Sequence, residues 1–505
     1  MNKIFMIVSA AVLFAGIFAQ SAVANNMKVT NVVMSAGDYS TYTIVQSDIS
    51  WDHSWRAAWL ETNANPEVTV TNWDAAWIFL KYRTDGVNWM HASLNITNSK
   101  HSATGPIGST INVGLSTNAG GTNFGAGVFF YRSAEGSGSW TNKVKLRWNY
   151  KQDGLTSTTR VEVCVHAVEM VYVPQCNFYV GDGRTTIITG TFENGAFTNA
   201  LQITSENQLT LGGGTDGSLG NNNTNGMQAG MGDDFNDTVT TNLPPEFPKG
   251  YNAFYCMKYE ISQGQYADFL NMLTPVQAVN RFPTNNGINR FTITSNASVY
   301  AASAPDRACN WLSWADGTAY EDWAGLRPMT ELEFEKACRG PVAPVVNEFA
   351  WGNGSWTAVT NFFDVDGSGT EIADPSTANC NGNNKIPGPV RCGIYATSVS
   401  GRSNAGATYW GIMEMSGDLY EMTVSVGSAA GRQFTGIHGD GMLNPDGSAN
   451  CGLWPNTSAT GAGTRGGSWA WSVNSFGVSY RSYANWALSG RGNAGGNVRF
   501  VRTAP

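Results

Sequence analysis

Residues 310–340 read NWLSWADGTAYEDWAGLRPMTELEFEKACRG, and this stretch predicts two consecutive helices. Ser313 stands at the start of the first helical run, in the position of an N-cap. Thr330 is followed three residues later by Glu333, the spacing of a capping box that satisfies two backbone donors at a helix start. Gly340 is well placed to end the second helix, because glycine readily adopts the left-handed conformation of a C-terminal cap.

The sequence around this stretch indicates an α+β domain over residues 166–505. Ser262 and Gln265 form another capping box and predict a third helix. The segment MVYVPQCNFYVGDG, residues 170–183, is typical of a pair of strands. Residues 212–242 are rich in Gly and Asn and predict a long surface loop or an insertion. Few helices among many short strands and loops give this domain a large irregular fraction.

Residues 25–165 predict an all-β sandwich of about seven to nine strands. Short runs that alternate apolar and polar residues are bounded by Gly, Asn, Asp or Ser, and none has helical periodicity over three turns. The runs are TYTIVQ, EVTVTNW, AAWIFLKY, AGVFFYR, KVKLRWNY and TRVEVCVHAV. The aromatic residues of this region are interpreted mainly as core, with a carbohydrate-binding platform as the alternative; they are Trp51, Trp55, Trp73, Trp77, Phe79 and Trp148.

The first 24 residues predict a secretory signal peptide. Lys3 precedes an apolar run, and small residues end at Ala24, where cleavage is expected. We therefore expect an exported protein, extracellular, on the cell surface or in the periplasm. No later apolar run approaches the roughly 20 residues of a membrane-spanning helix. The net charge of −8 without a basic block argues against nucleic acid and anionic membranes as partners.

The eight cysteines predict disulfide bonds, because an even number in an exported chain favours pairing over free thiols. Cys380 and Cys392 are close in sequence and are the first pair expected. There is no C-x-x-C motif, and the five histidines are scattered, which argues against a zinc site.

Six segments occur in the order found in the formylglycine-generating enzyme (sulfatase-modifying factor) family, and the chain resembles that family over residues 166–505. The segments are MVYVPQCNFYVGD, YEISQGQYADFLN, the 310–340 stretch, WGIMEMSGDLYEMT, RGGSW and VRFVR. The resemblance implies the family's variant of the C-type lectin fold: a mostly irregular domain with a small twisted sheet, few helices and structural calcium. It does not cover the N-terminal sandwich.

The resemblance also implies where the family's chemistry would lie. Its oxidases bind copper(I) through two cysteine thiolates after the Gly-Gly-Ser corner, and soft thiolate ligands suit copper(I). Here those two places hold Trp471 and Phe476. We therefore expect no bound copper, and we favour a protein without catalytic activity. Another enzyme on this fold, an iron-dependent sulfoxide synthase, uses a histidine cluster for which the scattered histidines offer no match.

The segment SGDLYEM contains the residues that the resemblance assigns to calcium. Asp418 and Glu421 stand where the family has an Asn and a Glu that hold calcium with nearby carbonyls, and oxygen ligands suit this cation. Asn379 is placed like the Asn of the family's other calcium loop. The alternatives for Asp418 and Glu421 are a solvated carboxylate pair and an acid/base pair.

The C-terminal segment after the Gly-Gly-Ser corner lacks the family's two cysteines and is interpreted as a ligand-binding surface. Aromatic residues combined with Asn are typical of binding loops, since they give contact area at low entropic cost; the residues are Trp471, Asn474, Tyr480, Tyr483, Asn485 and Trp486. We expect a non-catalytic surface or extracellular structural or binding protein that contacts proteins, glycans or copies of itself. Packing of the last loops is the simpler interpretation of these residues. The alternative functions are a sulfatase-maturation oxidase and a retroelement-diversified receptor.

Overall fold

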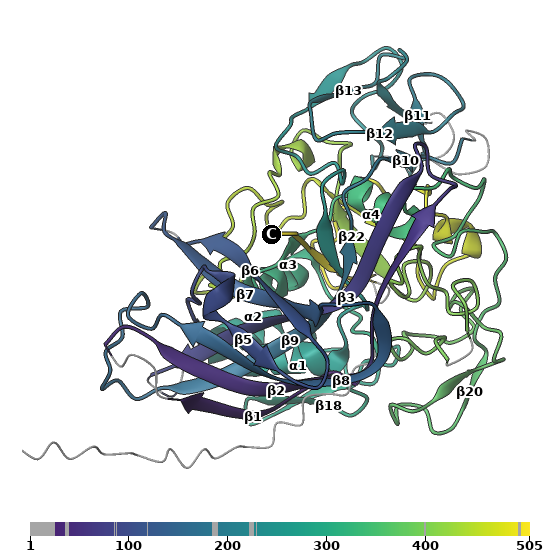
Figure 1. Cartoon of the computed structure of the whole chain (residues 1–505). Coiled ribbons are helices and arrows are strands. Elements are labelled where there is room, and N and C mark those ends of the chain that lie inside the picture. The colour runs from purple at the N-terminus through teal and green to yellow at the C-terminus, as the bar shows by residue number, and fades with distance from the viewer. Residues whose placement is uncertain are drawn as a thin grey trace, which may run out of the picture.

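The computed structural model describes residues 26–505 apart from 36–39, 85, 87, 119, 184–189, 222–226, 229, 398–399 and 493–495. The described part is rich in strands and has few helices, and its N-terminal region is all-β, as predicted (Figure 1). The predicted signal peptide lies outside the described residues. No helix in the described ranges is both long and apolar enough to cross a membrane.

The N-terminal strands pack as two layers. The strands are β1 (Lys28–Ser35), β2 (Thr43–Glu61), β3 (Val68–Arg83), β4 (Met90–His91), β5 (Ser102–Thr104), β6 (Ser109–Thr117), β7 (Asn123–Arg132), β8 (Gly136–Trp148) and β9 (Glu162–Val173), with a 3-10 turn at Asn98–Lys100. One layer joins β1, β2, β8 and β5, and the other joins β6, β7, β3 and β9. Because the long strands β2 and β3 also pair with each other, hydrogen bonds connect both layers into one 12-stranded sheet.

Strand β3 faces two different cores. Ala76, Ile78 and Leu80 point into the core between the two layers, where the buried rings of Trp51 and Trp148 confirm the core interpretation for those residues. The intervening residues, including Trp77 and Phe79, belong to the core shared with the second half of the chain. This alternation follows from the two-residue period of a strand.

The main sheet continues across the predicted boundary between residues 165 and 166. That boundary falls inside β9, which pairs with β3 on one side and with β16 (Phe254–Met257) on the other. Strands β25 (Phe500–Thr503) and β19 (Arg327–Pro328) extend the sheet beyond β16. The two parts are therefore neighbours within one sheet, and their division into separate folding units stays a prediction.

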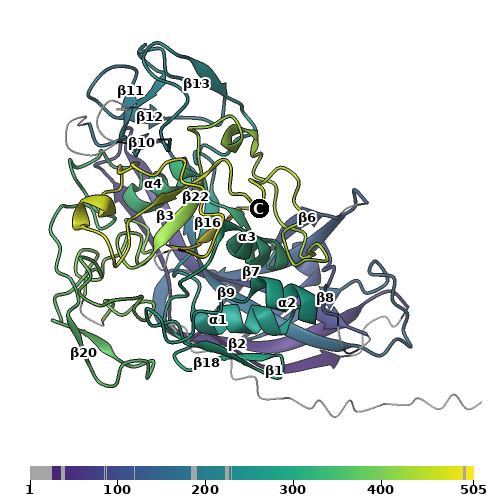
Figure 2. The ribbon, with the colours of Figure 1, turned by 180° about the vertical axis from the view of Figure 1, so that it is seen from behind.

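The three predicted helices are confirmed. They are α1 (Gln263–Asn271), α3 (Trp314–Trp323) and α4 (Glu331–Arg339), and their N-caps Ser262, Ser313 and Thr330 all complete capping boxes. Helices α1 and α3 lie against the face of the sheet that carries Trp77 (Figure 2). A fourth helix, α2 (Pro275–Arg281), was missed, although Thr274, Pro275 and Gln277 carry the same capping signal.

The remaining strands are short and form small sheets around the helices. They are β10 (Phe178–Val180), β11 (Phe192–Asn194), β12 (Leu201–Ile203), β13 (Leu209–Leu211), β14 (Leu219–Asn221), β15 (Thr241–Leu243), β17 (Ile293–Asn296), β18 (Val299–Ala302), β20 (Asn361–Phe363), β21 (Ile372–Asp374), β22 (Tyr420–Val424), β23 (Ala462–Arg465) and β24 (Gly496–Asn497), with 3-10 turns at Gly431–Gln433 and Val473–Phe476. The lectin-like arrangement of this half stays a prediction.

Part of the segment 212–242, expected to be a surface loop, differs from that expectation. Its described residues include β14, and Phe235 is fully buried in the core. The apolar residues Leu219 and Phe235 explain the difference. Both are core residues, but the many Gly and Asn residues around them made the whole segment resemble a surface loop.

Candidate functional site

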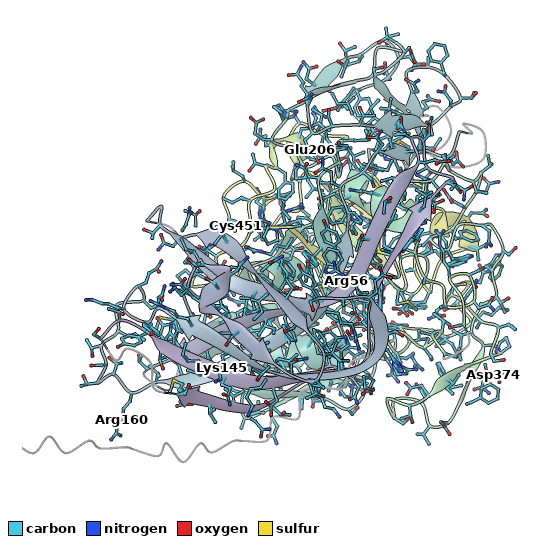
Figure 3. The ribbon with its side chains drawn as sticks, viewed as in Figure 1. Arg56, Lys145, Arg160, Glu206, Asp374 and Cys451 are labelled. Atoms are coloured by element: carbon cyan, nitrogen blue, oxygen red, sulfur yellow. The ribbon has the colours of Figure 1, made fainter. Side chains whose placement is uncertain are left out.

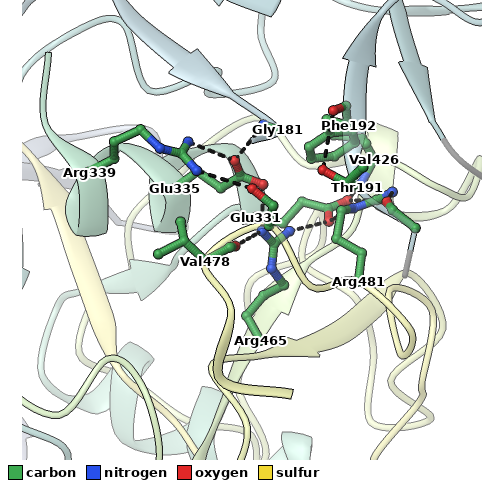
Figure 4. Close-up of polar contacts among 12 residues, drawn as sticks. Gly181, Thr191, Phe192, Glu331, Glu335, Arg339, Val426, Arg465, Val478 and Arg481 are labelled. Carbon is green, nitrogen blue, oxygen red and sulfur yellow. Dashed lines mark hydrogen bonds and ion pairs between the residues drawn. The ribbon is translucent and has the colours of Figure 1, made fainter. Parts of the chain in front are cut away.

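A buried network of ion pairs fixes the C-terminal tail to helix α4 (Figure 4). Glu331 and Glu335 lie one turn apart on the helix and point the same way. Arg465, at the end of β23, binds Glu331 at 3.0 Å and Glu335 at 2.6 Å. Arg481 binds Glu331 at 2.7 Å and Asp233 at 2.9 Å. Both ends of the segment 465–481 therefore meet on one helix.

In this network, pairing with arginine affects the pKa of Glu331 more than burial does. Burial alone would raise the pKa of Glu331, but Arg481 and Arg465 hold it below its ordinary value. The arginines also bind backbone carbonyls, Arg465 that of Val478 at 2.6 Å and Arg481 that of Gly190 at 2.9 Å. Both arginines thus tie carboxylates and loop carbonyls together.

The tail turns sharply at its Gly-Gly corner. Gly466 and Gly467 have φ values of +79° and +71°, a region that side chains rarely adopt. A Cβ on Gly467 would lie 2.4 Å from the ring of Phe476. Phe476 itself is fully buried against Phe349 and Trp351. One of the two places expected for a family cysteine is thus a core position.

The other place lies at the surface within a cluster of four aromatic rings. Trp471 is 40% exposed, and its ring centroid is 5.7 Å from that of Tyr483. Tyr483 is 5.0 Å from Trp486, and Tyr420 of β22 is 6.0 to 6.4 Å from the other three rings. We call these four residues the aromatic cluster. The structure therefore brings together three of the six predicted ligand-binding residues and adds Tyr420, which the sequence analysis missed.

The other three predicted ligand-binding residues have different surroundings. Asn485 donates to the carbonyls of Gly232 at 2.7 Å and Gly427 at 3.0 Å, so its amide holds two loops together. Asn474 is exposed in the 3-10 turn beside Trp471, and Tyr480 is half-buried. Asn474 and Tyr480 stay predictions as ligand contacts.

Asp418 and Glu421 lie in a buried group of four acids with one arginine. Burial, together with neighbouring acids, raises the pKa of Glu260 well above its usual range and that of Glu414 to about 8. Burial also raises the pKa of Asp418 to about 6, although hydrogen bonds from Asn381, Glu260 and Val390 oppose the rise. Glu421 accepts from Arg499 at 2.8 Å. We call Glu260, Glu414, Asp418 and Glu421 the acidic group.

The acidic group is short of positive charge. Among the residues that the structure describes, only Arg499 is bound directly, and Arg290 and Arg391 act through charge alone, so protons or a cation would complete the balance of four buried carboxylates. One oxygen each of Glu414 and Glu421 is buried without a hydrogen-bond partner, and oxygen donors of this kind suit calcium. No set of three or more His, Cys, Asp or Glu side chains in the described ranges is arranged as metal ligands. A cation here would therefore need backbone carbonyls as well.

The side chain of Asn379 holds two loop segments together through hydrogen bonds. Its amide oxygen accepts from Thr357 at 2.9 Å, and its amide nitrogen donates to Ser403 at 3.0 Å. Its neighbour Asn381 contacts Asp418 at 3.0 Å. Asn381 therefore contacts the acidic group, whereas Asn379, assigned by resemblance to the family's other calcium loop, stays a prediction.

The predicted disulfides are wrong for this structure, in which all eight cysteines are free thiols. Cys380 packs beside Phe476, whereas Cys392 lies in a separate apolar cluster. Five cysteines are fully or almost fully buried, and Cys451 at the surface is half-buried (Figure 3). The five buried cysteines all pack in apolar clusters, which is common for buried cysteine.

The sequence was compared with protein families and with curated proteins. The chain matches the model of the "sulfatase-modifying factor enzyme 1-like domain" over residues 194–503, more than half of its length. It is 33% identical over 123 residues to a hercynine oxygenase of Mycolicibacterium smegmatis, covering 24% of this chain and 22% of that protein. It is 28% identical over 129 residues to a formylglycine-generating enzyme of Bos taurus, covering 20% of this chain and 34% of that enzyme.

These matches cover well under two thirds of each relative, whereas the family model spans nearly all of the second half of the chain. Five of the six motifs, the capped helices and the anchored Gly-Gly-Ser corner lie within the matched range. The chain belongs to the sulfatase-modifying factor enzyme 1-like family.

Proposed function

We propose that the protein is a non-catalytic member of this family that binds a glycan or protein surface through the aromatic cluster. The observation that carries the proposal is the exposed ring of Trp471 at the place expected for a catalytic cysteine. Neighbouring rings hold it, and the turn that presents it is anchored at both ends by Arg465 and Arg481. Rigid aromatic contacts of this kind lose little entropy on binding.

Substitution of Trp471 tests this proposal. Trp471→Ala should leave folding intact, because the side chain is largely at the surface, and should weaken binding at least about tenfold, as loss of a central aromatic anchor does. Trp356→Ala is the matched control, since Trp356 is 37% exposed and lies outside the aromatic cluster. The measurement is binding of the full chain to a glycan array and to immobilised copies of itself. Equal binding by both variants would refute the assignment.

An oxidase is the second candidate, because the relatives are named formylglycine-generating enzyme and hercynine oxygenase. The thiol that packs beside Phe476 is that of Cys380, which is 1% exposed, and burial raises its pKa to about 12. Such a group is not the accessible thiolate that copper(I) requires. Turnover of a cysteine-containing sulfatase peptide in the presence of copper would overturn the non-catalytic proposal.

We further propose structural calcium at Asp418 and Glu421, and export directed by the signal peptide. The unbalanced charge of the acidic group supports the cation. Isothermal titration calorimetry of calcium binding tests the calcium proposal, with the full chain compared with its Glu421→Gln variant. Heat of binding that is unchanged in the variant would place the cation elsewhere.

A further inference from the structure

Three ionisable side chains from three neighbouring strands meet inside the molecule. Asp74 lies on β3 and Glu169 on β9, while Lys258 directly follows β16. The main sheet has the order β3–β9–β16, and Asp74 lies opposite Val171, so it is a diagonal neighbour of Glu169 on the adjacent strand. The backbone N–H of Lys258 donates to the carbonyl of Glu169 at 3.0 Å, which fixes their register. Asp74 and Glu169 precede Lys258 by a long stretch of chain, so the contact joins the N-terminal strands to the second half.

The distances within this triad are short. Lys258 Nζ lies 2.7 Å from Glu169 Oε1 and 3.8 Å from Asp74 Oδ2. The Asp74 side chain is fully buried, and those of Glu169 and Lys258 are 2% and 9% exposed. Reacting atoms in productive complexes are about 3–3.5 Å apart. The Lys258 amine thus contacts its proton acceptor Glu169 directly and lies 3.8 Å from an oxygen of the Asp74 carboxyl group, so a small approach would bring it to reacting distance, largely away from water.

The surroundings polarise the Asp74 carboxyl group. The backbone N–H of Trp55 donates to Oδ1 at 2.8 Å, and the indole N–H of Trp51 donates to Oδ2 at 3.2 Å. Donors aimed at a carbonyl oxygen stabilise the negative charge that develops there when a nucleophile attacks. The ring of Tyr259 lies 5.5 Å from Lys258 Nζ and helps to exclude water.

The charges of the triad permit proton transfer without a net change of charge. Burial raises the pKa of Asp74 to about 7, and Glu169 adds to the rise while Lys258 opposes it. Asp74 thus carries its proton in part of the molecules at neutral pH. Burial would lower the pKa of Lys258, but Glu169 and other neighbours raise it overall, so Lys258 begins as an ammonium. Transfer of a proton from Lys258 to Glu169 removes both charges from the buried site.

We propose that Lys258 and Asp74 condense into an intramolecular isopeptide bond, with Glu169 as the proton acceptor. Nζ of Lys258 forms a bond to Cγ of Asp74, and the bond from Cγ to the departing hydroxyl oxygen breaks. Of the three ammonium protons, one stays on the amide nitrogen, one leaves with the hydroxyl group as water, and one rests on Glu169. The reaction is a condensation and needs no oxidant, reductant or cofactor.

The bond would tie β3 of the N-terminal region to the end of β16 in the second half. Formation of the bond releases one water molecule, so the bond can be detected from the mass of the protein without any assay of function. A lasting ion pair is the competing interpretation of the same contacts, and it leaves the mass unchanged. The mass of the protein therefore separates the two.

The test is the intact mass of the purified full chain after unfolding and reduction. The expected mass is lower than that calculated from the sequence, starting at the observed N-terminus, by one water molecule. Trypsin should then fail to cleave after Lys258 and should release a branched peptide that contains Asp74. The full calculated mass, with normal cleavage after Lys258, would overturn the proposal whether or not any variant folds.

Variants assign the roles. Glu169→Gln keeps the shape of the side chain but removes the base, and Lys258→Arg removes the nucleophile, so both should show the full calculated mass. Lys81→Met is the matched control, because Lys81 is also a buried lysine but donates to the carbonyl of Gly441 at 2.9 Å. This variant should still lack one water. Loss of water in Lys258→Arg would place the bond elsewhere and overturn the assignment.

Discussion

Arg481→Ala removes the guanidinium that joins helix α4 to the C-terminal tail and to the loop around Asp233. In the wild type, Arg481 contacts Glu331 at 2.7 Å and Asp233 at 2.9 Å, and its side chain is fully buried. The variant leaves Asp233 with the amide of Asn221 at 2.6 Å, and leaves Glu331 with Arg465 at 3.0 Å. One buried negative charge thus loses its counter-charge.

Removal of one partner from a buried ion pair destabilises a protein by about 3–5 kcal/mol, because the remaining charge is buried without compensation. With an unfolding entropy of about 2.1 cal/mol/K per residue, a chain of this length that unfolds as one unit should lose about 3–5 °C in Tm. Arg83→Ala is the control. Its partner Glu162 is 59% exposed, and exposed pairs contribute about 0–1 kcal/mol.

Differential scanning calorimetry of the two variants and the wild type measures the effect. The double variant Arg481→Ala with Glu331→Gln should lose less stability than the two single variants lose together. Each single substitution leaves the charge of the other residue buried without its partner. If Arg481→Ala lost no more stability than Arg83→Ala, the network would be a minor contributor to the fold. The account of an anchored tail would then be refuted.

Two further outcomes follow from the acidic group and the cysteines. Without added calcium, stability should fall as pH rises from about 4, where unfolded carboxyl groups ionise, toward 8, because folded Asp418 and Glu414 keep protons up to pH values of about 6 and 8. Urea unfolding at several pH values should show this slope, and Glu414→Gln should flatten it; an unchanged slope would locate the titrating group elsewhere. The buried thiols, such as Cys338, should resist iodoacetamide in the native protein at pH 8 and react after unfolding, since burial raises the pKa of Cys338 well above its ordinary value. Mass spectrometry counts the labelled thiols, and native labelling of Cys338 would contradict its burial.

The helices could be predicted because their signals are local. Ser262, Ser313 and Thr330 each cap a helix by bonds that span three residues, so the sequence contains the whole interaction. The Gly-Gly-Ser corner could also be recognised, since two consecutive glycines mark it in the sequence. The missed helix α2 has the same local signal at Thr274, so it was available to sequence analysis.

The contacts that were missed are those between distant segments. Nothing near Asp418 in sequence indicates that Glu260 will lie beside it, and the pairing of β9 with both β3 and β16 is set by the packing of the whole chain. The cysteines illustrate the same limit. Their even number predicted bridges, but pairing depends on which side chains meet, and Cys380 and Cys392 pack in different clusters.

The anchoring of the tail explains how the fold can accept different side chains at position 471. Arg465 and Arg481 hold the two ends of the segment, and Phe476 fills the core beneath it, so these positions carry the stability. Trp471 and Asn474 lie exposed on the turn between the anchors, where substitutions usually change stability by no more than about 0.5 kcal/mol. The exposed positions can therefore change chemistry without loss of the fold. A substitution at position 471 therefore leaves the anchored turn in place, and an aromatic ring held on such a turn fits the proposed binding function.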